Sequence, residues 1–123
     1  VEVAAGKRAS IVCGDLRIVR DFIDVRDVIG AYDLVMEKGA AGEIYNVCSG
    51  RGVTLSELVE RLCDRLKIAV KVEVSKELIR PVDNPVIVGD NSKLKKLGFR
   101  AEYKLDRSLD DMVAWWKKKI AEE

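Results

Sequence analysis

The stretch that decides the fold covers residues 20–27 and reads R-D-F-I-D-V-R-D. Its first four residues read as a short strand or extended segment, and Asp24 is a residue type that favours the N-terminus of a helix. Over residues 25–37 apolar side chains then recur at helical spacing, namely Val25, Val28, Ile29, Tyr32, Val35 and Met36. Because such a stripe normally packs against a core, we expect this side of the helix to be buried.

Strands and helices alternate along the rest of the chain as well. Further strands are expected at residues 10–13, 43–48, 70–74 and 86–88, and residues 1–6 read as a helix end closed by Gly6. Thr54 and Glu57 match a capping box before a second amphipathic helix, and a short helix is expected near Asp90 or Asn91. The last helix is expected at residues 107–121, capped by Asp106 or Ser108, with Trp116 in its buried stripe. This order predicts an α/β fold with a small mixed sheet and packed helices.

Composition narrows the class of protein. The 123 residues suit one domain, 1–123, and 22 Lys and Arg against 21 Asp and Glu give a net charge of only +1. This balance argues against a nucleic-acid or membrane partner. Cys13, Cys48 and Cys63 are widely spaced and there is no histidine, so neither a zinc site nor any other metal site is expected. The odd number of cysteines and the lack of a signal peptide or long apolar run favour a soluble, cytoplasmic protein.

Several short motifs occur together in one order. After R-D-F-I-D-V-R-D come Y-N-V-C-S-G at residues 45–50, R-P-V-D-N-P at residues 80–85, G-D-N-S-K at residues 89–93 and L-G-F at residues 97–99. The combination resembles the C-terminal, substrate-binding part of extended short-chain dehydrogenases/reductases, of the GDP-mannose 4,6-dehydratase and GDP-4-keto-6-deoxymannose reductase type. UDP-sugar epimerases share the same skeleton. Two departures are Cys48, where many relatives carry glycine, and Phe99, where many carry tryptophan.

The resemblance implies three substrate-binding residues. Arg20 and Arg80 would bind the diphosphate of a GDP-sugar, and Asp83 would accept hydrogen bonds from ribose hydroxyls. A planar guanidinium can grip phosphate oxygens with two bonds, and a carboxylate suits a vicinal diol. The residue types alone leave another interpretation open, in which Arg80 and Asp83 form an ion pair on a surface turn and Arg20 pairs with Asp21.

The features with which this family holds its cofactor and transfers protons are absent. The only G-x-G is Gly50-Arg51-Gly52, and the position of a third glycine is Leu55. The family's Tyr-x-x-x-Lys pair fails for Tyr32, Tyr45 and Tyr103, which are followed four residues later by Met36, Ser49 and Arg107. No catalytic residue and no cofactor are therefore expected in this chain, and NAD(P) is expected in a full-length parent.

The sequence thus predicts the substrate-binding lobe of a Rossmann-type sugar-nucleotide enzyme, present as a C-terminal fragment without its N-terminal dinucleotide-binding domain. Its expected partners are a GDP-sugar and that missing Rossmann domain, and it is expected to be inactive alone. Two alternatives stay open: the substrate domain of a UDP-sugar epimerase, and a non-enzymatic α/β module used for packing or interaction.

Overall fold

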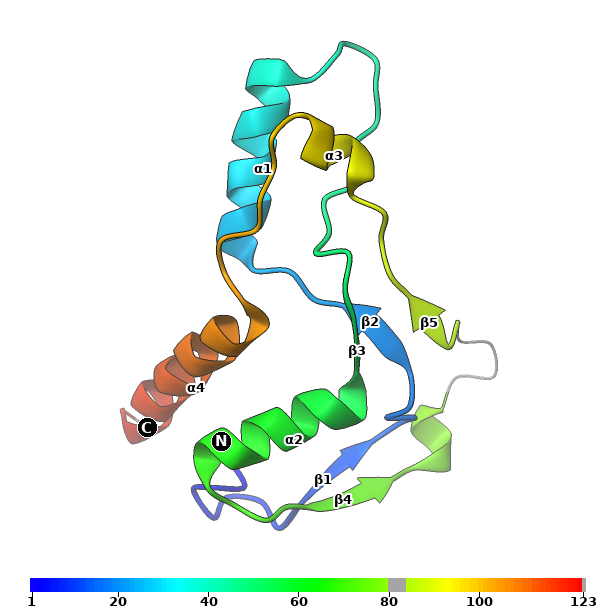
Figure 1. Cartoon of the computed structure of the whole chain (residues 1–123). Coiled ribbons are helices and arrows are strands. Elements are labelled where there is room, and N and C mark those ends of the chain that lie inside the picture. Colours follow the sequence, from blue (N-terminus) through cyan, green and yellow to red (C-terminus); the bar gives the residue numbers. More distant parts are fainter. Residues whose placement is uncertain (80–83, 123) are drawn as a thin grey trace.

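The chain folds into two lobes joined by a small sheet, as a computed structural model that describes residues 1–79 and 84–122 shows (Figure 1). The upper lobe, residues 25–50 and 88–103, contains α1 and α3, and the lower lobe, residues 1–18, 55–79 and 104–122, contains β1, β4, α2 and α4. The elements in chain order are β1 (Ser10–Cys13), β2 (Val19–Asp21), α1 (Val25–Lys38), β3 (Gly52–Thr54), α2 (Leu55–Leu66), β4 (Lys71–Val74), the 3-10 turn η1 (Lys76–Leu78), β5 (Val86–Ile87), α3 (Ser92–Lys96) and α4 (Leu105–Ala121).

The strands pair in a mixed pattern. β1 runs parallel to β4, whereas β2 lies between β3 and β5, antiparallel to the first and parallel to the second. In the middle strand Arg20 stands opposite Val53 and Ile87. The predicted α/β fold with mixed pairing is confirmed, although the described strands form two small sheets and not one.

Helix ends follow local sequence closely. Asp24 caps α1 by accepting from the Arg26 amide at 2.9 Å, and Thr54 caps α2 by accepting from the Glu57 amide at 3.1 Å. The last helix begins at Leu105, earlier than expected, and neither Asp106 nor Ser108 is its cap. Residues 1–6 form hydrogen-bonded turns with Gly6 at a φ of 72°, and not a regular helix.

The buried core of the upper lobe is small and one-sided. It consists of Ala31, Leu94 and Phe99, against which Ile23, Leu34, Val35, Tyr45, Val47 and Leu97 pack. The expectation that the apolar stripe of α1 is buried was wrong for four of its six members, Val25, Ile29, Tyr32 and Met36, which are exposed. Met36 is 88% exposed. The helix buries the neighbouring flank, which carries Asp27 and Ala31, because the described residues supply only one layer of packing.

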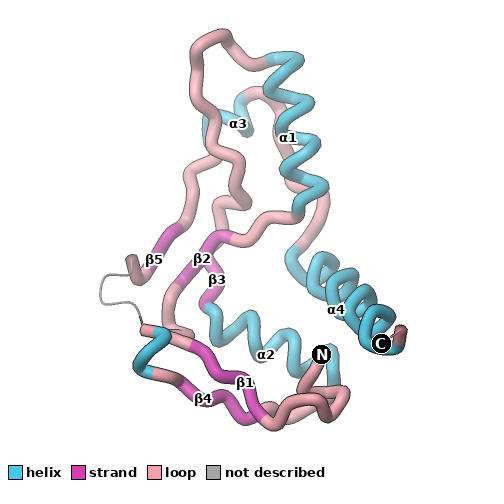
Figure 2. The backbone as a smooth tube through the Cα atoms, turned by 180° about the vertical axis from the view of Figure 1, so that it is seen from behind, coloured by secondary structure: helices cyan, strands magenta, loops and turns pink. Residues whose placement is uncertain are grey.

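The predicted strand at residues 43–48 is not one. Figure 2 shows the chain between α1 and β3 as a loop. A strand needs a partner for its backbone groups, and the described residues place none beside this segment. The side chains nevertheless alternate, with Tyr45 and Val47 packed on the core and Ile44 81% exposed.

The lower lobe is held by two helices that are only partly buried. In α4, Leu109 and Val113 are buried as expected, but Trp116, predicted to lie in the buried stripe, is 43% exposed. Its ring meets that of Trp115 edge-on at 4.8 Å between centroids, so the two rings cover each other in part. No residue of α2 is fully buried.

The three aspartates of the opening motif each join segments that are distant in sequence. Asp21 accepts hydrogen bonds from the Ser49 amide (2.8 Å), the Ser49 hydroxyl (2.5 Å), the Gly50 amide (2.9 Å) and the Gly89 amide (3.2 Å). Asp24 accepts from the hydroxyl of Ser108 on α4, and Asp27 accepts from the amides of residues 102 and 103. The hydrogen bonds of this motif therefore hold four other segments of the chain in position, around residues 49–50, 89, 102–103 and 108.

These contacts favour the ionised carboxylates. Burial alone would raise the pKa of Asp21, but the hydrogen bonds from Ser49, Gly89 and Gly50 outweigh it and lower the pKa. The pKa of Asp24 lies well below its ordinary value, chiefly because the Arg26 guanidinium donates to it, with help from Ser108. A carboxyl whose pKa is lowered on folding stabilises the fold above its unfolded pKa, and this contribution is lost as the pH falls through the folded pKa.

Asp21→Asn tests the first of these junctions. The amide puts an NH2 group where the Ser49, Gly50 and Gly89 donors need an acceptor, so we expect a loss of about 1–3 kcal/mol in the free energy of unfolding at pH 7. The variant should also lose less further stability than the parent chain below a pH of about 4, where free aspartate titrates. Urea unfolding at several pH values measures both effects. Asp33→Asn, at an exposed position of α1, is the control; parallel pH curves for parent and Asp21→Asn would contradict the assignment.

Gly89→Ala tests the close approach of the segment after β5 to the loop that carries Cys48. An added Cβ would lie 2.4 Å from the Cys48 Sγ and 2.7 Å from its Cβ, so the backbone must shift. We expect a destabilisation of about 1–3 kcal/mol, as for other overpacked sites, measured by chemical unfolding. Gly30→Ala is the matched control, because its Cβ meets nothing within 4 Å and alanine should raise the stability of α1 by about 0.5–1 kcal/mol. Equal stabilities for the two variants would show that Gly89 is not tightly packed.

Candidate functional site

Arg20 lies on the middle strand of the three-stranded sheet and reaches toward the turn before β5. Its Nη1 donates to the carbonyl of Val19 at 2.8 Å and to the carbonyl of Asn84 at 2.9 Å. The amide of Val19 donates to the carbonyl of Pro85 at 2.8 Å, so backbone and side chain both hold the end of this turn against β2. Arg20 and the residues that immediately follow Asp83 are therefore neighbours in space.

A pocket of about 550 Å³ opens beside this guanidinium, within the size range of small-molecule sites. Its wall is mostly apolar and comes from β1 and the turn after it, β2, the start of α2, η1 and the start of β5. The lining residues are Cys13, Gly14, Asp15, Leu16, Ile18, Arg20, Phe22, Leu55, Leu78, Ile79 and Pro85. Arg80 and Asp83 lie outside the described residues, but Ile79 and Pro85, which flank that segment, both line the Arg20 pocket.

The described lining of the Arg20 pocket carries two charged residues. Arg20 and Asp15 are these residues, and Asp15 is already bound by Arg17 through Nε at 2.9 Å and Nη2 at 2.8 Å. The side-chain hydrogen bonds of Arg17 lower the pKa of Asp15 to about 2. This exposed ion pair adds little stability, but it engages the Asp15 carboxylate at the pocket rim.

A second pocket of about 370 Å³ lies between α2, α4 and β1. Its described lining is largely aliphatic, including Leu62, Leu66, Val113 and Ile120, with Trp116 at one side. Its charged lining residues, Glu2 and Arg8, pair with each other, so we assign it to the loose packing of the lower lobe.

The glycines of Gly50-Arg51-Gly52 serve packing and do not form a dinucleotide cradle. A Cβ at Gly52 would lie 2.5 Å from Cγ1 of Val19 and 2.9 Å from Cγ2 of Val88, so this glycine lets strands approach each other. Gly50 turns the chain at a φ of 74° against the side chain of Asn91. The residues present therefore do not fit a pyrophosphate at this turn.

The three tyrosines and Cys48 do not line the Arg20 pocket, and several of them already form contacts elsewhere. Tyr45 accepts a hydrogen bond from the Ala40 amide, Tyr103 stacks under the Arg26 guanidinium at 3.8 Å, and Tyr32 is exposed on α1. Cys48 is buried, which raises the pKa of its thiol. Within residues 1–79 and 84–122, no group of acidic, cysteine or histidine side chains could hold a metal ion, and no helix is long and apolar enough to cross a membrane.

Sequence reasoning named Arg20, which lines this pocket, but it did not name the apolar residues of the wall. Leu16, Ile18, Phe22, Leu55 and Leu78 come from separate segments that meet only through the pairing of β1 with β4 and of β2 with β3. Nothing in the residue types distinguishes these side chains from core residues. Asn46 and Ser49 join neighbouring loops, because Asn46 donates to the Asp90 carbonyl and the Ser49 hydroxyl donates to Asp21.

Comparison with known proteins gives consistent matches. The family described as GDP-mannose 4,6 dehydratase matches residues 1–112. A GDP-6-deoxy-D-mannose reductase from Pseudomonas aeruginosa is 32% identical over 111 residues, which are 89% of this chain and 36% of the reductase. A probable UDP-arabinose 4-epimerase from Arabidopsis thaliana is 36% identical over 85% of this chain and 26% of its own length.

Solved structures agree with the sequence matches. The structure of RMD from Pseudomonas aeruginosa complexed with NADPH superposes with a TM-score of 0.89 at 29% identity, over 96% of this chain and 39% of that one. UDP-glucose 4-epimerase from Thermotoga maritima, with UDP-glucose, superposes with a TM-score of 0.84 at 28% identity, over 97% of this chain and 38% of that one. This chain spans well under half the length of these relatives. It belongs to the GDP-mannose 4,6 dehydratase family of extended short-chain dehydrogenases/reductases, whose members modify sugar nucleotides.

Proposed function

We propose that residues 1–123 are the nucleotide-sugar-binding portion of an enzyme like GDP-mannose 4,6-dehydratase or GDP-4-keto-6-deoxymannose reductase. The observation that carries the proposal is the position of Arg20 at a pocket of small-molecule size, beside Asn84 and Pro85. This pocket combines the guanidinium-bearing residue Arg20 with an apolar wall, which suits a diphosphate attached to a nucleoside.

Arg20 is suited to a diphosphate by geometry as well as charge. Its strand pairs on both sides, with Val53 and Ile87, so the backbone that carries it is fixed. A guanidinium presents its donors in a rigid fork that matches two phosphate oxygens, and a residue held by a sheet loses little freedom when it binds.

Arg80 and Asp83 are proposed as the second diphosphate ligand and the ribose acceptor on the strength of the R-P-V-D-N-P motif. The support from the fold is indirect: Asn84, the residue after Asp83, accepts the hydrogen bond of Arg20, and Pro85 lines the same pocket. Pro81 and Pro85 would limit the freedom of the turn that carries both side chains.

The oxidoreductase or dehydratase chemistry is assigned to a longer parent, in which NAD(P) would exchange hydride with C4 of the hexose. The chain by itself supplies neither a fitting cofactor turn nor a Tyr-x-x-x-Lys pair. We therefore propose that residues 1–123 alone bind nucleotide sugar but do not turn it over.

Titration of GDP-mannose into the isolated chain, followed by amide chemical shifts, tests the site. We expect weak binding, with shifts near Arg20 and Gly14, because this chain forms only part of the substrate pocket. Arg20→Ala should weaken affinity at least about tenfold, which corresponds to one charge-assisted hydrogen bond. Arg20→Lys should have an intermediate affinity, because lysine lacks the forked donors of a guanidinium.

Arg100→Ala, at an exposed position in the upper lobe, is the control. Unfolding of each variant is measured alongside, since Arg20 also holds Asn84. Unchanged affinity in both Arg20→Ala and Arg80→Ala would refute the ligand assignment.

Competition between GDP and UDP separates the proposed class from its main alternative. If the chain derives from a GDP-sugar enzyme, GDP should displace bound GDP-mannose at lower concentration than UDP does. The reverse order would indicate a UDP-sugar epimerase ancestry, and no displacement by either nucleotide would favour an α/β packing module.

A further inference from the structure

Asp15 is a carboxylate at the rim of the Arg20 pocket to which the proposed function gives no role. Arg20 and Asp15 are the two charged residues of the described lining, and a diphosphate bound by Arg20 would be repelled by Asp15 if it lay beside it. A neutral group with several N–H donors would be attracted instead. In a nucleoside diphosphate the base is the group at the end opposite the diphosphate.

The start of α2 holds the loop that follows Asp15. The Ser56 amide donates to the carbonyl of Leu16 at 2.9 Å. The Leu55 amide donates to the carbonyl of Ile18 at 3.1 Å. Because both donors belong to the first turn of a helix, the loop after Asp15 has a fixed position beside the pocket.

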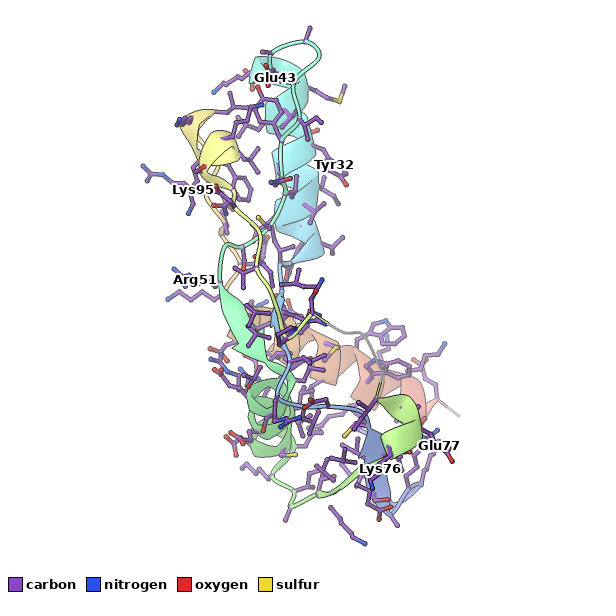
Figure 3. All side chains as sticks on the ribbon, turned by 90° about the vertical axis from the view of Figure 1, so that its right-hand side faces the viewer. Tyr32, Glu43, Arg51, Lys76, Glu77 and Lys95 are labelled. Atoms are coloured by element: carbon purple, nitrogen blue, oxygen red, sulfur yellow. The ribbon has the colours of Figure 1, made fainter. Side chains whose placement is uncertain are left out.

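The turn before Asp15 is packed tightly against η1. A Cβ on Gly14 would lie 2.7 Å from the carbonyl oxygen of Leu78, so any side chain here would force the two segments apart. Figure 3 shows Lys76 and Glu77 of η1 in the lower lobe near β1, and neither of them lines the pocket. Asp15 is thus carried by a loop whose two ends are both held in place.

The carboxylate of Asp15 has a fixed orientation and a partner that is easily displaced. Its Oδ1 accepts from the backbone amide of Arg17 at 2.9 Å, a bond that does not involve the Arg17 side chain. The guanidinium of Arg17 donates through Nε to Oδ1 at 2.9 Å and through Nη2 to Oδ2 at 2.8 Å. The Arg17 side chain is 90% exposed, against 26% for Asp15, so water readily replaces these two bonds when the guanidinium moves away.

The guanidinium of Arg17 shows which kind of ligand group fits the Asp15 carboxylate. It offers two parallel N–H donors from one planar unit, one to each carboxylate oxygen. Guanine presents the same arrangement at its edge, because N1–H and the exocyclic N2–H2 group are attached to one carbon atom. Uracil presents a single N–H between two carbonyl oxygens, and a carboxylate repels those oxygens. A carboxylate therefore favours guanine and disfavours uracil.

We propose that Asp15 selects guanine, by accepting hydrogen bonds from N1–H and N2–H2 of a guanosine diphosphate whose phosphates lie at Arg20. The inference rests on the proposed function, because it takes the Arg20 pocket to be a nucleoside diphosphate site. It goes further by naming the base and the side chain that distinguishes it. The base would replace the Arg17 guanidinium and pack against the apolar wall, which includes Phe22.

The fold by itself leaves the choice of base open. Relatives of this chain include a protein named for a GDP-sugar and one named for a UDP-sugar, at 32% and 36% identity. A shared fold thus carries both kinds of nucleotide, and the difference must come from individual side chains at the pocket. Asp15 is the acidic side chain of the described lining, and so it is the group that can make this distinction by charge.

Titrations of GDP and inosine diphosphate into the chain, followed by amide chemical shifts, test this contact. Inosine diphosphate lacks only the N2 amino group, so it should bind the unsubstituted chain at least about tenfold more weakly than GDP. In Asp15→Asn the two ligands should bind with nearly equal affinity, because the side-chain amide offers one acceptor to the two donors of guanine. Asparagine can still accept from the amide two residues on, so the turn is kept and affinity for inosine diphosphate should not change. Equal affinities in the unsubstituted chain, or an equal loss of both ligands in Asp15→Asn, would overturn the proposal.

Xanthosine diphosphate adds a measurement that a purely structural role of Asp15 would not change. Xanthine has a carbonyl oxygen where guanine has its N2 amino group, so it is repelled by a carboxylate but can accept from an asparagine amide. Asp15→Asn should therefore raise the affinity for xanthosine diphosphate relative to GDP at least about tenfold. An unchanged ratio would count against selection by Asp15.

Two further variants serve as controls. Glu77→Gln removes an exposed carboxylate of η1 that does not line the pocket, and it should leave the preference for GDP over inosine diphosphate unchanged. Arg17→Ala should bind GDP no more weakly than the unsubstituted chain, since it removes the group that competes for Asp15. A loss of the preference in Glu77→Gln would indicate a general effect of charge, and weaker binding in Arg17→Ala would make Arg17 the ligand; either result contradicts the proposal.

Two outcomes separate this inference from its rival and from the proposed function. If Asp15 meets the ribose and not the base, 2′-deoxy-GDP should bind more weakly than GDP in the unsubstituted chain but not in Asp15→Asn, and the inference fails. If none of these diphosphates binds, the proposed function fails and the inference fails with it. GDP that binds without preference over inosine diphosphate refutes the selection by Asp15 alone.

Discussion

The carboxylate of Asp21 is the interaction on which the rest of the upper lobe depends. It collects donors from Ser49, Gly50 and Gly89, and it thereby fixes the turn before β3 and the segment after β5 against the end of β2. Successive side chains of a strand point to opposite faces of the sheet, so Arg20 and Asp21 make their contacts on opposite sides of β2. Arg20 faces the pocket and Asp21 faces the junction. A substitution at Arg20 therefore changes the pocket and its bond to Asn84, whereas a substitution at Asp21 changes the junction.

The parts of the fold that the sequence predicted well are those set by local interactions. Asp24 and Thr54 cap helices because their side chains reach amides two or three residues away, and no tertiary partner is needed. The exposed α1 stripe and segment 44–47 were mispredicted for the opposite reason. Their patterns are those of buried elements, and whether they are buried depends on a packing layer that the described residues do not provide. Trp116 belongs to the same group, since helical spacing predicts a face but not what covers it.

The candidate site shows the same division between local and distant information. Arg20, Arg80 and Asp83 were predicted as ligands because they lie in recognisable motifs, and that prediction stays untested. The apolar wall was not, because Leu16, Leu55 and Leu78 are 39 and 23 residues apart in sequence and meet only through strand pairing. Charged residues that could bind a ligand are few enough in a sequence motif to be noticed one by one. Apolar pocket residues have no such signature.

In the lower lobe, ion pairs connect α2 with α4, although α2 has no fully buried residue. Because α2 has no fully buried residue, its register against α4 depends on Arg65, which donates to Asp106 and Asp110 and has a side chain only 19% exposed. Arg61 adds a bond to Asp106. A single exposed ion pair contributes little to stability. Several ion pairs between the same two helices, however, favour one alignment of these helices over the others. This matters for function because Leu55, at the start of α2, lines the Arg20 pocket. The position of one pocket wall is thus set by arginines about two and three helical turns away, and a loss of their carboxylate partners would shift Leu55 through the rigid helix between them.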